Sequence, residues 1–191
     1  MNGGSTPAGR PVPRLLPGVG LPVGAIIQYA YTVADIDAEI AKQIEVFGIG
    51  PWFKLGPFTP PEARYRGEPT TMTVTIARAF AGTTMMELVA QHDDAPSVYR
   101  EVIERRGHGF HHFAITSDDL DADVARFAAR GYAVCFEDRM PSGGRITYVD
   151  ATGDLPGMVE IIEMTPAQEQ KFAAFKKAAE NWDGFDPIRV G

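Results

Sequence analysis

Two of the chain's four histidines, His111 and His112, stand side by side in the run GFHHFAI at residues 109–115. The other residues of this run are mostly apolar, which is typical of a buried strand. Burying an imidazole in such a strand is costly unless the ring has a partner. We therefore expect at least one of these two side chains to bind a ligand or to form a hydrogen bond.

The composition is that of a soluble globular protein that works on small molecules. The chain has 191 residues, 45% of them hydrophobic, enough for one good core or two small ones packed together. Its net charge of −7 leaves no basic stripe to neutralise phosphates, so neither nucleic acid nor an anionic membrane is expected as a partner. The single cysteine, Cys135, argues against a disulfide and fits a cytoplasmic location. No apolar run approaches the roughly 20 residues of a membrane span.

An internal repeat determines the expected fold. The segment QYAYTVADIDAEIA at residues 28–41 aligns with HFAITSDDLDADVA at residues 112–125, at an offset of 84 (112 minus 28). Each copy contains a β-rich run, an acidic turn that can cap a helix, and an amphipathic helix. The helices are predicted at about 36–47 and 119–130. Three strand-like segments follow in each copy, PWFKLGPF, TMTVTIARAFAG and TTMMELVAQ in the first and YAVCFEDR, GRITYVDAT and GMVEIIEM in the second.

The repeat predicts an α+β fold made of two paired βαβββ modules. The modules span residues 25–90 and 108–164. A linking helix at 95–106 lies in the connecting segment 91–107, and a C-terminal helix at 165–182 begins the final segment 165–191. Residues 1–24 are interrupted by Pro and Gly too often for a signal-peptide core and are expected to form a flexible N-terminal arm.

The arrangement of these modules and several sequence motifs resemble those of a known family. The paired modules, the passage PSVYREVIERRGHGFHHFAI and the closing YVDATGDLPGMVEIIE resemble the vicinal oxygen chelate superfamily. That superfamily includes glyoxalase I, methylmalonyl-CoA epimerase, extradiol dioxygenases and bleomycin-resistance proteins, and the passage around the histidine pair looks most like the epimerases. The resemblance covers about residues 25–164. It implies that each module curls its sheet into a half-barrel and that the two halves enclose one metal ion.

The family places its metal ligands on the first and last strands of each module. Carried onto this sequence, the resemblance implies the ligands Gln28, Glu87, His112 and Glu160. Strand alternation agrees with this set, because Gln28 shares a face with the small residues Ala30 and Thr32. Glu87 and Glu160 lie in apolar strands, where carboxylates are costly without a cation.

Strand alternation also assigns each of the two histidines to a face of the strand. By this rule His112 faces the cavity together with Phe110 and Ala114, and His111 faces the helix side together with Phe113 and Ile115. We therefore expect His112 to ligate the metal and His111 to have a structural or supporting role.

One imidazole, one amide and two carboxylates suit a single divalent metal ion, without distinguishing Zn, Ni, Co, Mn, Mg or Fe. The resemblance implies that the metal chelates a carbonyl-type substrate. Glu160 or Glu87 then moves an α-proton through a metal-bound enolate, as in isomerases, epimerases or glyoxalase-type lyases. The ligand order Gln, Glu, His, Glu matches one branch of glyoxalase I, whereas the epimerases have His, Gln, His, Glu.

The sequence departs from the epimerases at their second acid/base residue. The corresponding stretch offers only Lys54, Glu62 or Glu68, none of them at a matching position. The stretch is instead aromatic, which predicts a bulky hydrophobic or aromatic substrate. The expected pocket residues are Trp52, Phe53, Phe110, Met140 and Tyr148, with Arg145 available for a carboxylate or phosphate.

Two other functions remain open. A non-haem iron dioxygenase would normally use two histidines and one carboxylate, and Gln28 occupies the place of the first histidine. A metal-free protein that binds a small molecule for resistance would have no need for two buried glutamates. A homodimer is also expected, because Phe172, Phe175 and Trp182 on the C-terminal helix offer apolar surface.

Overall fold

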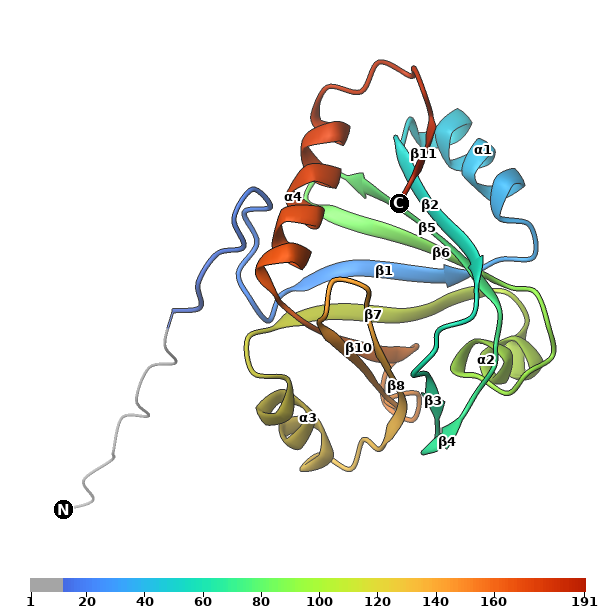
Figure 1. Cartoon of the computed structure of the whole chain (residues 1–191), viewed down its shortest axis with the longest axis vertical. Coiled ribbons are helices and arrows are strands. Elements are labelled where there is room, and N and C mark those ends of the chain that lie inside the picture. The colour runs from blue at the N-terminus through green and yellow to red at the C-terminus, as the bar shows by residue number, and fades with distance from the viewer. Residues whose placement is uncertain (1–11) are drawn as a thin grey trace.

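The computed structural model describes residues 12–191 (Figure 1). The first module consists of β1 (Ile26–Thr32), α1 (Ile36–Phe47), β2 (Trp52–Phe58), β5 (Val74–Ala81) and β6 (Thr84–Gln91). The second consists of β7 (Gly109–Ser117), α3 (Leu120–Ala128), β8 (Val134–Arg139), β9 (Arg145–Val149) and β10 (Met158–Glu163). The helix α2 (Val98–Arg106) links them, and α4 (Pro166–Glu180) follows. The predicted α+β fold of two βαβββ modules is confirmed.

The two repeat helices begin at equivalent aspartates. Asp35 caps α1 by accepting hydrogen bonds of 3.0 Å from the backbone amides of Asp37 and Ala38. Asp119, which is 84 residues further on, caps α3 by accepting one of 3.0 Å from Ala122. Such caps satisfy amides that have no partner within the helix. The acidic turns of the repeat therefore set where both helices start.

The modules meet at the centre of one curved sheet. The strand order is β11-β2-β5-β6-β1-β7-β10-β9-β8-β3-β4, with β1 and β7 antiparallel to each other at the middle. Within each module the last strand runs parallel to the first, β6 beside β1 and β10 beside β7. The helices α1 and α3 cover the outer face (Figure 1). The inner face is therefore built from both modules.

Both first strands contain a one-residue bulge at equivalent positions. Between the pairs Ile26–Ile115 and Gln28–Ala114, β1 has one extra residue, and between Ala30–His112 and Tyr31–Phe110, β7 has one. The extra residues are Ile27 and His111, which the repeat aligns with each other. Each bulge lies immediately before the residue that the sequence predicts as a ligand.

Because an extra residue interrupts strand alternation, the predicted alternation holds from Gln28 and from His112 onward but is wrong at and before the bulges, at Ile27, Phe110 and His111. Ile27 packs in the inner cluster that contains Phe80 and Met85. The ring of His111 lies 5.1 Å from that of His112, so both histidines occupy the inner side. Phe110 is turned to the outer face, where its ring lies 4.7 Å from that of Phe113.

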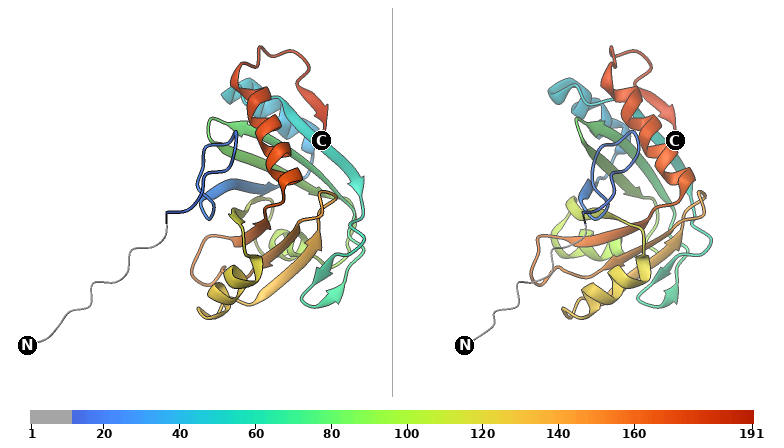
Figure 2. Two further views of the ribbon diagram at one scale, coloured as in Figure 1. Left: turned by 60° about the vertical axis from the view of Figure 1, so that its left-hand side comes forward. Right: turned by 90° about the vertical axis from the view of Figure 1, so that its left-hand side faces the viewer.

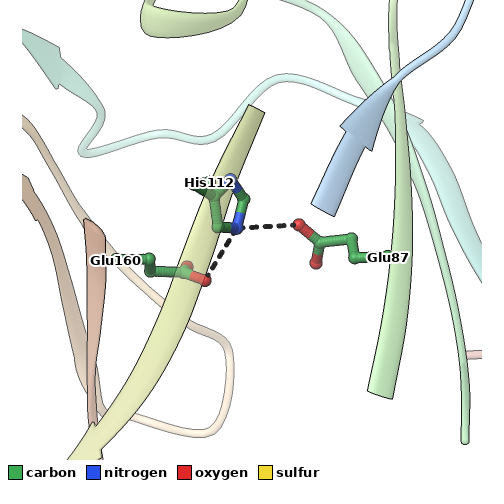
Figure 3. A group of neighbouring side chains, drawn as sticks. All are labelled: Glu87, His112 and Glu160. Atoms are coloured by element: carbon green, nitrogen blue, oxygen red, sulfur yellow. Dashed lines mark ion pairs between the residues drawn. The ribbon is translucent and has the colours of Figure 1, made fainter. Parts of the chain in front are cut away.

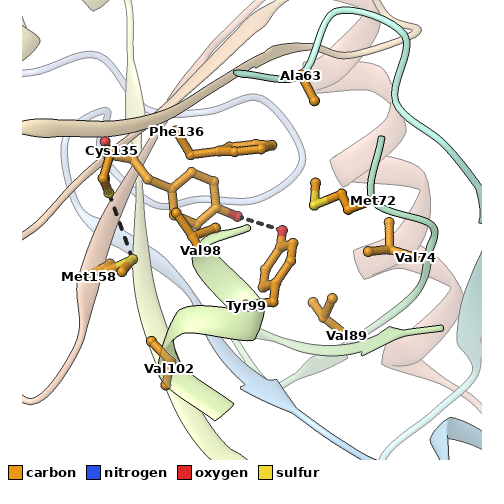
Figure 4. Packing of buried hydrophobic residues seen from close by; sticks show 11 residues of the cluster. Ala63, Met72, Val74, Val89, Val98, Tyr99, Val102, Cys135, Phe136 and Met158 are labelled. Atoms are coloured by element: carbon orange, nitrogen blue, oxygen red, sulfur yellow. Dashed lines mark hydrogen bonds between the residues drawn. The ribbon is translucent and has the colours of Figure 1, made fainter. Parts of the chain in front are cut away.

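Two apolar clusters pack against the inner face of the sheet, one around α2 and one around α4. Around α2, the residues Val98, Tyr99 and Val102 pack with Phe136 and Met158 (Figure 4). Tyr99 also shares a hydrogen bond of 3.3 Å with Tyr148 of β9. This cluster connects the linking helix to both modules.

The second cluster forms around α4, where Phe172 and Phe175 pack with Leu16 and Val19 of the N-terminal stretch. Figure 2 shows this stretch beside α4. Residues 12–24 therefore do not form the flexible arm that was expected, and residues 1–11 of that prediction lie outside the described residues. Phe172 and Phe175 are 1% and 7% exposed, so they do not offer the surface predicted for a homodimer, which stays a prediction.

Three short strands were not predicted. The loop between β2 and β5 carries β3 (Arg64–Tyr65) and β4 (Glu68–Pro69), and β3 pairs with β8 of the second module. The C-terminal tail adds β11 (Ile188–Val190), which runs parallel to β2. Residues 59–73 thus connect the open edge of one half-barrel to the other. Among the described residues, no helix has the length and apolar character to cross a membrane.

Candidate metal centre

Three buried side chains, Glu87, His112 and Glu160, converge at the middle of the inner face (Figure 3). Nε2 of His112 lies 3.2 Å from Oε2 of Glu160 and 3.6 Å from Oε1 of Glu87. One ligand atom of each residue lies within 4.8 Å of the other two. All three residues are at most 2% exposed. We refer to them as the triad.

Strand register brings the triad together around two small residues. Ala30 of β1 lies opposite both Glu87 of β6 and His112 of β7. Ala114 of β7 lies opposite Glu160 of β10. Residues opposite each other on paired strands share a face. Because alanine has no side chain beyond Cβ, the longer triad side chains can meet in the space above these two positions.

His111 fixes the orientation and the tautomer of His112. Nε2 of His111 lies 3.0 Å from the backbone carbonyl of Val98, which can only accept, so this nitrogen carries the hydrogen. Burial lowers the pKa of His111 to about 3, so its ring is neutral and its Nδ1 accepts. Nδ1 of His112, 2.8 Å away, must then donate. Nε2 of His112 is left with a lone pair directed at the triad.

Gln28 of β1 lies beside the triad, with Nε2 at 3.2 Å from Nε2 of His112 and 3.2 Å from Oε2 of Glu160. Its Oε1 atom is buried and has no hydrogen-bond partner among the described residues. A buried amide oxygen without a partner is costly. Rotation of the amide group would exchange the two atoms and turn the oxygen toward the same point as the lone pair of His112.

The two glutamates differ in how their charge is balanced. Burial raises the pKa of Glu160 to about 7, against the opposing effects of Arg78, Tyr148 and Gln28. Burial also raises the pKa of Glu87, and there the nearby guanidinium of Arg78 opposes the rise. Nε of Arg78 lies 2.5 Å from Oε2 of Glu87. Glu87 thus has a fixed cationic partner, whereas Glu160 has no such direct ion pair with an arginine or lysine among the described residues.

The sequence analysis missed Arg78. It lies on β5 directly opposite Glu87 of β6. Its neighbours Ala77 and Ala79 pack on the outer face with the cluster beneath α1, so Arg78 is directed inward. A signal was present, because alternation in the segment TVTIARAFAG places this arginine between Ile76 and Phe80 in an otherwise apolar row. A charge at such a position needs a buried partner.

The donor set fits one divalent cation. It contains a neutral imidazole nitrogen, two carboxylates and an amide oxygen that lacks a partner, a mostly oxygen set that several divalent metals accept. The triad could hold such an ion, and Gln28 is proposed as a further ligand. A cation at this point would also balance the charge of Glu160.

The predicted pocket residues divide between the two faces of the sheet. Tyr148 lies opposite Glu160, and its ring centroid is 4.8 Å from that of His112. Phe53 lies on the inner face, where it stacks on Phe175 at 3.8 Å between ring centroids. Met140 packs at the edge of the cluster around α4.

Trp52, Phe110 and Arg145 do not line the space beside the triad. Trp52 is buried with the cluster beneath α1 on the outer face, because neighbouring strand residues point to opposite faces. Phe110 is turned outward by the bulge. Arg145 pairs with Asp121 of α3 and with Glu163, so it is held on the outer face.

None of the three candidates for a second acid/base residue lies at the triad. Lys54 pairs with Asp37 of α1 on the outer face, at 2.6 Å. Glu62 is exposed and lies 3.7 Å from Arg139. Glu68 is exposed on β4. A second carboxylate base from this stretch is therefore not part of the site.

Comparison with known proteins agrees with this architecture. The family model described as Glyoxalase/Bleomycin resistance protein/Dioxygenase superfamily matches residues 27–148. None of the curated proteins matches the sequence. A hypothetical protein from Bacillus halodurans C-125 has a similar structure, with a TM-score of 0.57 and 17% identity over 74% of this chain and 95% of that chain.

Two methylmalonyl-CoA epimerases have the same fold. The enzyme from Mycobacterium tuberculosis has a TM-score of 0.52 and 20% identity over 79% of this chain and 91% of its own. A single-residue variant of the Streptomyces coelicolor enzyme, in complex with 2-nitronate-propionyl-CoA, has a TM-score of 0.53 and 18% identity over 75% of this chain and 96% of its own. At these identities the likeness concerns the fold. Because the family model covers more than half of the sequence, this chain belongs to the glyoxalase/bleomycin resistance protein/dioxygenase superfamily.

Proposed function

We propose that this protein is a divalent-metal-dependent enzyme that moves the proton on a carbon next to a carbonyl group, as an isomerase, an epimerase or a glyoxalase-type lyase. The supporting observation is that two carboxylates, the lone pair of His112 and the amide group of Gln28, whose oxygen has no partner among the described residues, lie together in one buried place. One similar structure is a methylmalonyl-CoA epimerase in complex with methylmalonyl-CoA, whose substrate has such a carbon.

The metal, when bound, supplies a Lewis acid that polarises the substrate carbonyl. Glu160 is the proposed base. It is buried, and in the metal-free protein desolvation raises its pKa to about 7. This pKa would be lower beside a bound cation, so displacement of the carboxylate from the ion by substrate would restore its basicity near the working pH. Glu87 is less suited to this role, because Arg78 holds its carboxylate in an ion pair.

Tyr148, which lies opposite Glu160, is the proposed hydrogen-bond donor beside that carboxylate. Burial raises its pKa well above 10, so the phenol keeps its proton at neutral pH. Its hydroxyl also lowers the pKa of Glu160, as expected for a donor to that carboxylate. Tyr148 can thus stabilise negative charge on Glu160 or on a substrate oxygen. Among the aromatic residues predicted to line the pocket, only Tyr148 and Phe53 lie on the inner face, where they could contact an apolar group of the substrate.

The test is proton exchange in deuterated water. The protein is freed of metal and then loaded separately with each of the six candidate ions. Malonyl-type thioesters, hemithioacetals and aryl-substituted oxo acids are added, and loss of the α-proton signal is followed by NMR. We expect exchange with at least one metal and compound, and its loss after chelation. Full exchange in the chelated protein would contradict the metal-dependent mechanism.

The same samples separate the alternatives. Oxygen uptake by the iron-loaded protein without proton exchange would replace the isomerase proposal with the dioxygenase. Binding of a compound with neither exchange nor oxygen uptake, with or without metal, would favour a binding protein. His111 argues against the dioxygenase, because both of its ring nitrogens are engaged, by Val98 and by His112, and neither is free to complete a two-histidine set.

A further inference from the structure

Two basic side chains, Arg78 and Lys171, lie on the inner side of the sheet, and the proposed function gives neither a direct role in proton transfer. Arg78 comes from β5 of the first module. Lys171 comes from α4, which lies outside the part of the chain that the family model matches. Both are half-buried. A charged group in such a place is usually matched by a partner.

A stack of two phenylalanines connects the two cations. Phe53 lies opposite Arg78 in the register of β2 and β5, and Phe175 stacks on Phe53 at 3.8 Å between ring centroids. Nζ of Lys171 lies 5.5 Å from the centroid of the Phe175 ring. Lys171 and Phe175 are one helical turn apart and share a face of α4. The buried Phe172 places that face against the sheet.

The described residues leave hydrogen-bonding capacity on both cations. Arg78 donates from Nε to Glu87, and its two terminal nitrogens form no hydrogen bond with any described residue. Its side chain is 21% exposed, so these nitrogens can be reached. Lys171 forms no ion pair within residues 12–191. Burial lowers the pKa of Lys171, and the positive charge of Arg78 lowers it further, in keeping with the positions of the two cations at either end of the phenylalanine stack.

We propose that Arg78 and Lys171 form a binding site for a carboxylate group of the substrate, beside the candidate metal centre. The terminal nitrogens of an arginine present paired donors that match the two oxygens of a carboxylate, and the lysine adds a second charge. This inference rests on the proposed function, because it assigns a substrate class to the same site.

The charges of the site support this assignment. Arg78 is paired with Glu87, but a divalent ion would by itself match the two negative charges of Glu87 and Glu160. The site with Arg78 and Lys171 would therefore carry an excess of two positive charges. A carboxylate between them would remove their mutual repulsion. It would also orient the substrate, because Arg78 and Glu160 belong to different modules. The anionic group would lie toward the first module and the reacting carbon toward the base.

The binding test uses protein freed of metal by a chelating resin, so that the probe cannot bind through a metal ion. Malonate is titrated by calorimetry, with dimethyl malonate as the uncharged probe. We expect malonate to bind and dimethyl malonate to bind at least about fivefold more weakly, as for a partly exposed charge pair. The Lys171→Gln variant should lose a similar factor for malonate. Lys177→Gln is the matched control, because Lys177 is exposed on the same helix, and it should bind like the unmodified protein.

Arg78 is tested with Arg78→Lys, which keeps a charge for Glu87 and removes the paired donors. We expect weaker malonate binding in this variant with an unchanged circular dichroism spectrum. Equal binding of malonate by the unmodified protein and by Lys171→Gln would overturn the proposal, as would equal binding of malonate and its dimethyl ester.

A second measurement separates this inference from the proposed function. Proton exchange in the metal-loaded protein is compared between a malonyl thioester and its methyl ester. If malonate binding depends on Lys171 and no compound exchanges with any metal, the carboxylate site stands and the proposed function fails. If the ester exchanges as fast as the free acid, the proposed function stands and the carboxylate site is overturned.

Discussion

The two modules place side chains at equivalent positions around the site but fill those positions differently. Gln28 of β1 corresponds to His112 of β7, each directly after a bulge. Glu87 and Glu160 correspond on the last strands. The residues opposite these glutamates also correspond, and here the difference is greatest, with Arg78 in the first module and Tyr148 in the second.

If the proposed function is correct, these differences divide the chemistry between the modules. The first module combines a neutral amide with a glutamate whose charge is already paired. The second combines an imidazole lone pair, a phenol that retains its proton and a glutamate with a pKa raised to about 7. Under the proposed function, a shared backbone framework with unequal side chains would therefore give one side for charge and one side for proton transfer. The following changes test this division, beginning with the largest expected effect.

Removing the imidazole should have a far larger effect than removing the equivalent amide. In His112→Ala we expect no retained metal and no proton exchange, because the lone pair directed at the triad is lost. Gln28→Ala should bind metal more weakly and still retain some. Metal content after purification, with circular dichroism to confirm folding, measures both. Equal metal content in the two variants would contradict the comparison.

Substitution of the two glutamates should also have unequal effects on proton exchange. Glu160→Gln keeps an oxygen ligand and removes the base, so we expect metal to be retained while α-proton exchange falls by about 10²–10⁴-fold, the usual contribution of a general base. Glu87→Gln should lose much less exchange at saturating metal. NMR measures the exchange rates of both variants. Near-normal exchange in Glu160→Gln would show that another residue is the base.

The bulge residues offer a third contrast. His111→Phe fills a similar volume beside Tyr99 but removes the acceptor for Nδ1 of His112. We expect metal affinity to fall by about 10–100-fold, as is typical when the partner of a ligating histidine is lost. Ile27→Val changes the equivalent position of the first module and should leave affinity unchanged. Calorimetric titration with Zn²⁺ or Co²⁺ compares the two variants.

The pH dependence of metal binding should reflect mainly Glu160, because the ion pair with Arg78 opposes the rise in the pKa of Glu87. Glu160 must lose its proton to ligate, and its pKa in the metal-free protein is about 7, so affinity should fall about tenfold per pH unit below 7. The pKa of His112 is lowered to about 4, mainly by burial, so it adds no further loss down to pH 5. Titration in buffers of different ionisation enthalpy should show about one proton released. A slope of two that persists in Glu87→Gln would contradict the neutral state of His112, whereas a slope that falls to one in that variant would assign the second proton to Glu87.

Much of the fold could be predicted from the sequence because the repeat contains the same pattern of strands and helix twice. The helices were predicted to within a few residues, since capping aspartates and amphipathic spacing are local signals. The triad was predicted from the family resemblance, and the position of Glu87, His112 and Glu160 as polar residues in apolar strands supported that prediction. These signals depend only on residues near each other in the sequence.

The features that were missed depend on contacts between distant segments. The bulges at Ile27 and His111 are set by the pairing of β1 with β7, and alternation within one strand cannot reveal an extra residue relative to another strand. The burial of Phe172 depends on packing against the N-terminal stretch and the sheet. Arg78 could have been noticed as a charge in an apolar row, but its partner became evident only with the register of β5 and β6.

The central pairing of β1 with β7 has a consequence for how the protein folds. Its contacts join residues 26–32 to residues 109–115, and such non-local pairings slow folding, because the intervening loop must be closed before they form. Gln28 and Glu87 reach His112 and Glu160 only across this pairing. The complete site therefore does not exist until the two halves of the chain have joined. A metal ion held by this site would therefore bind the native chain in preference to its unfolded form, and would stabilise it by mass action without nucleating its formation.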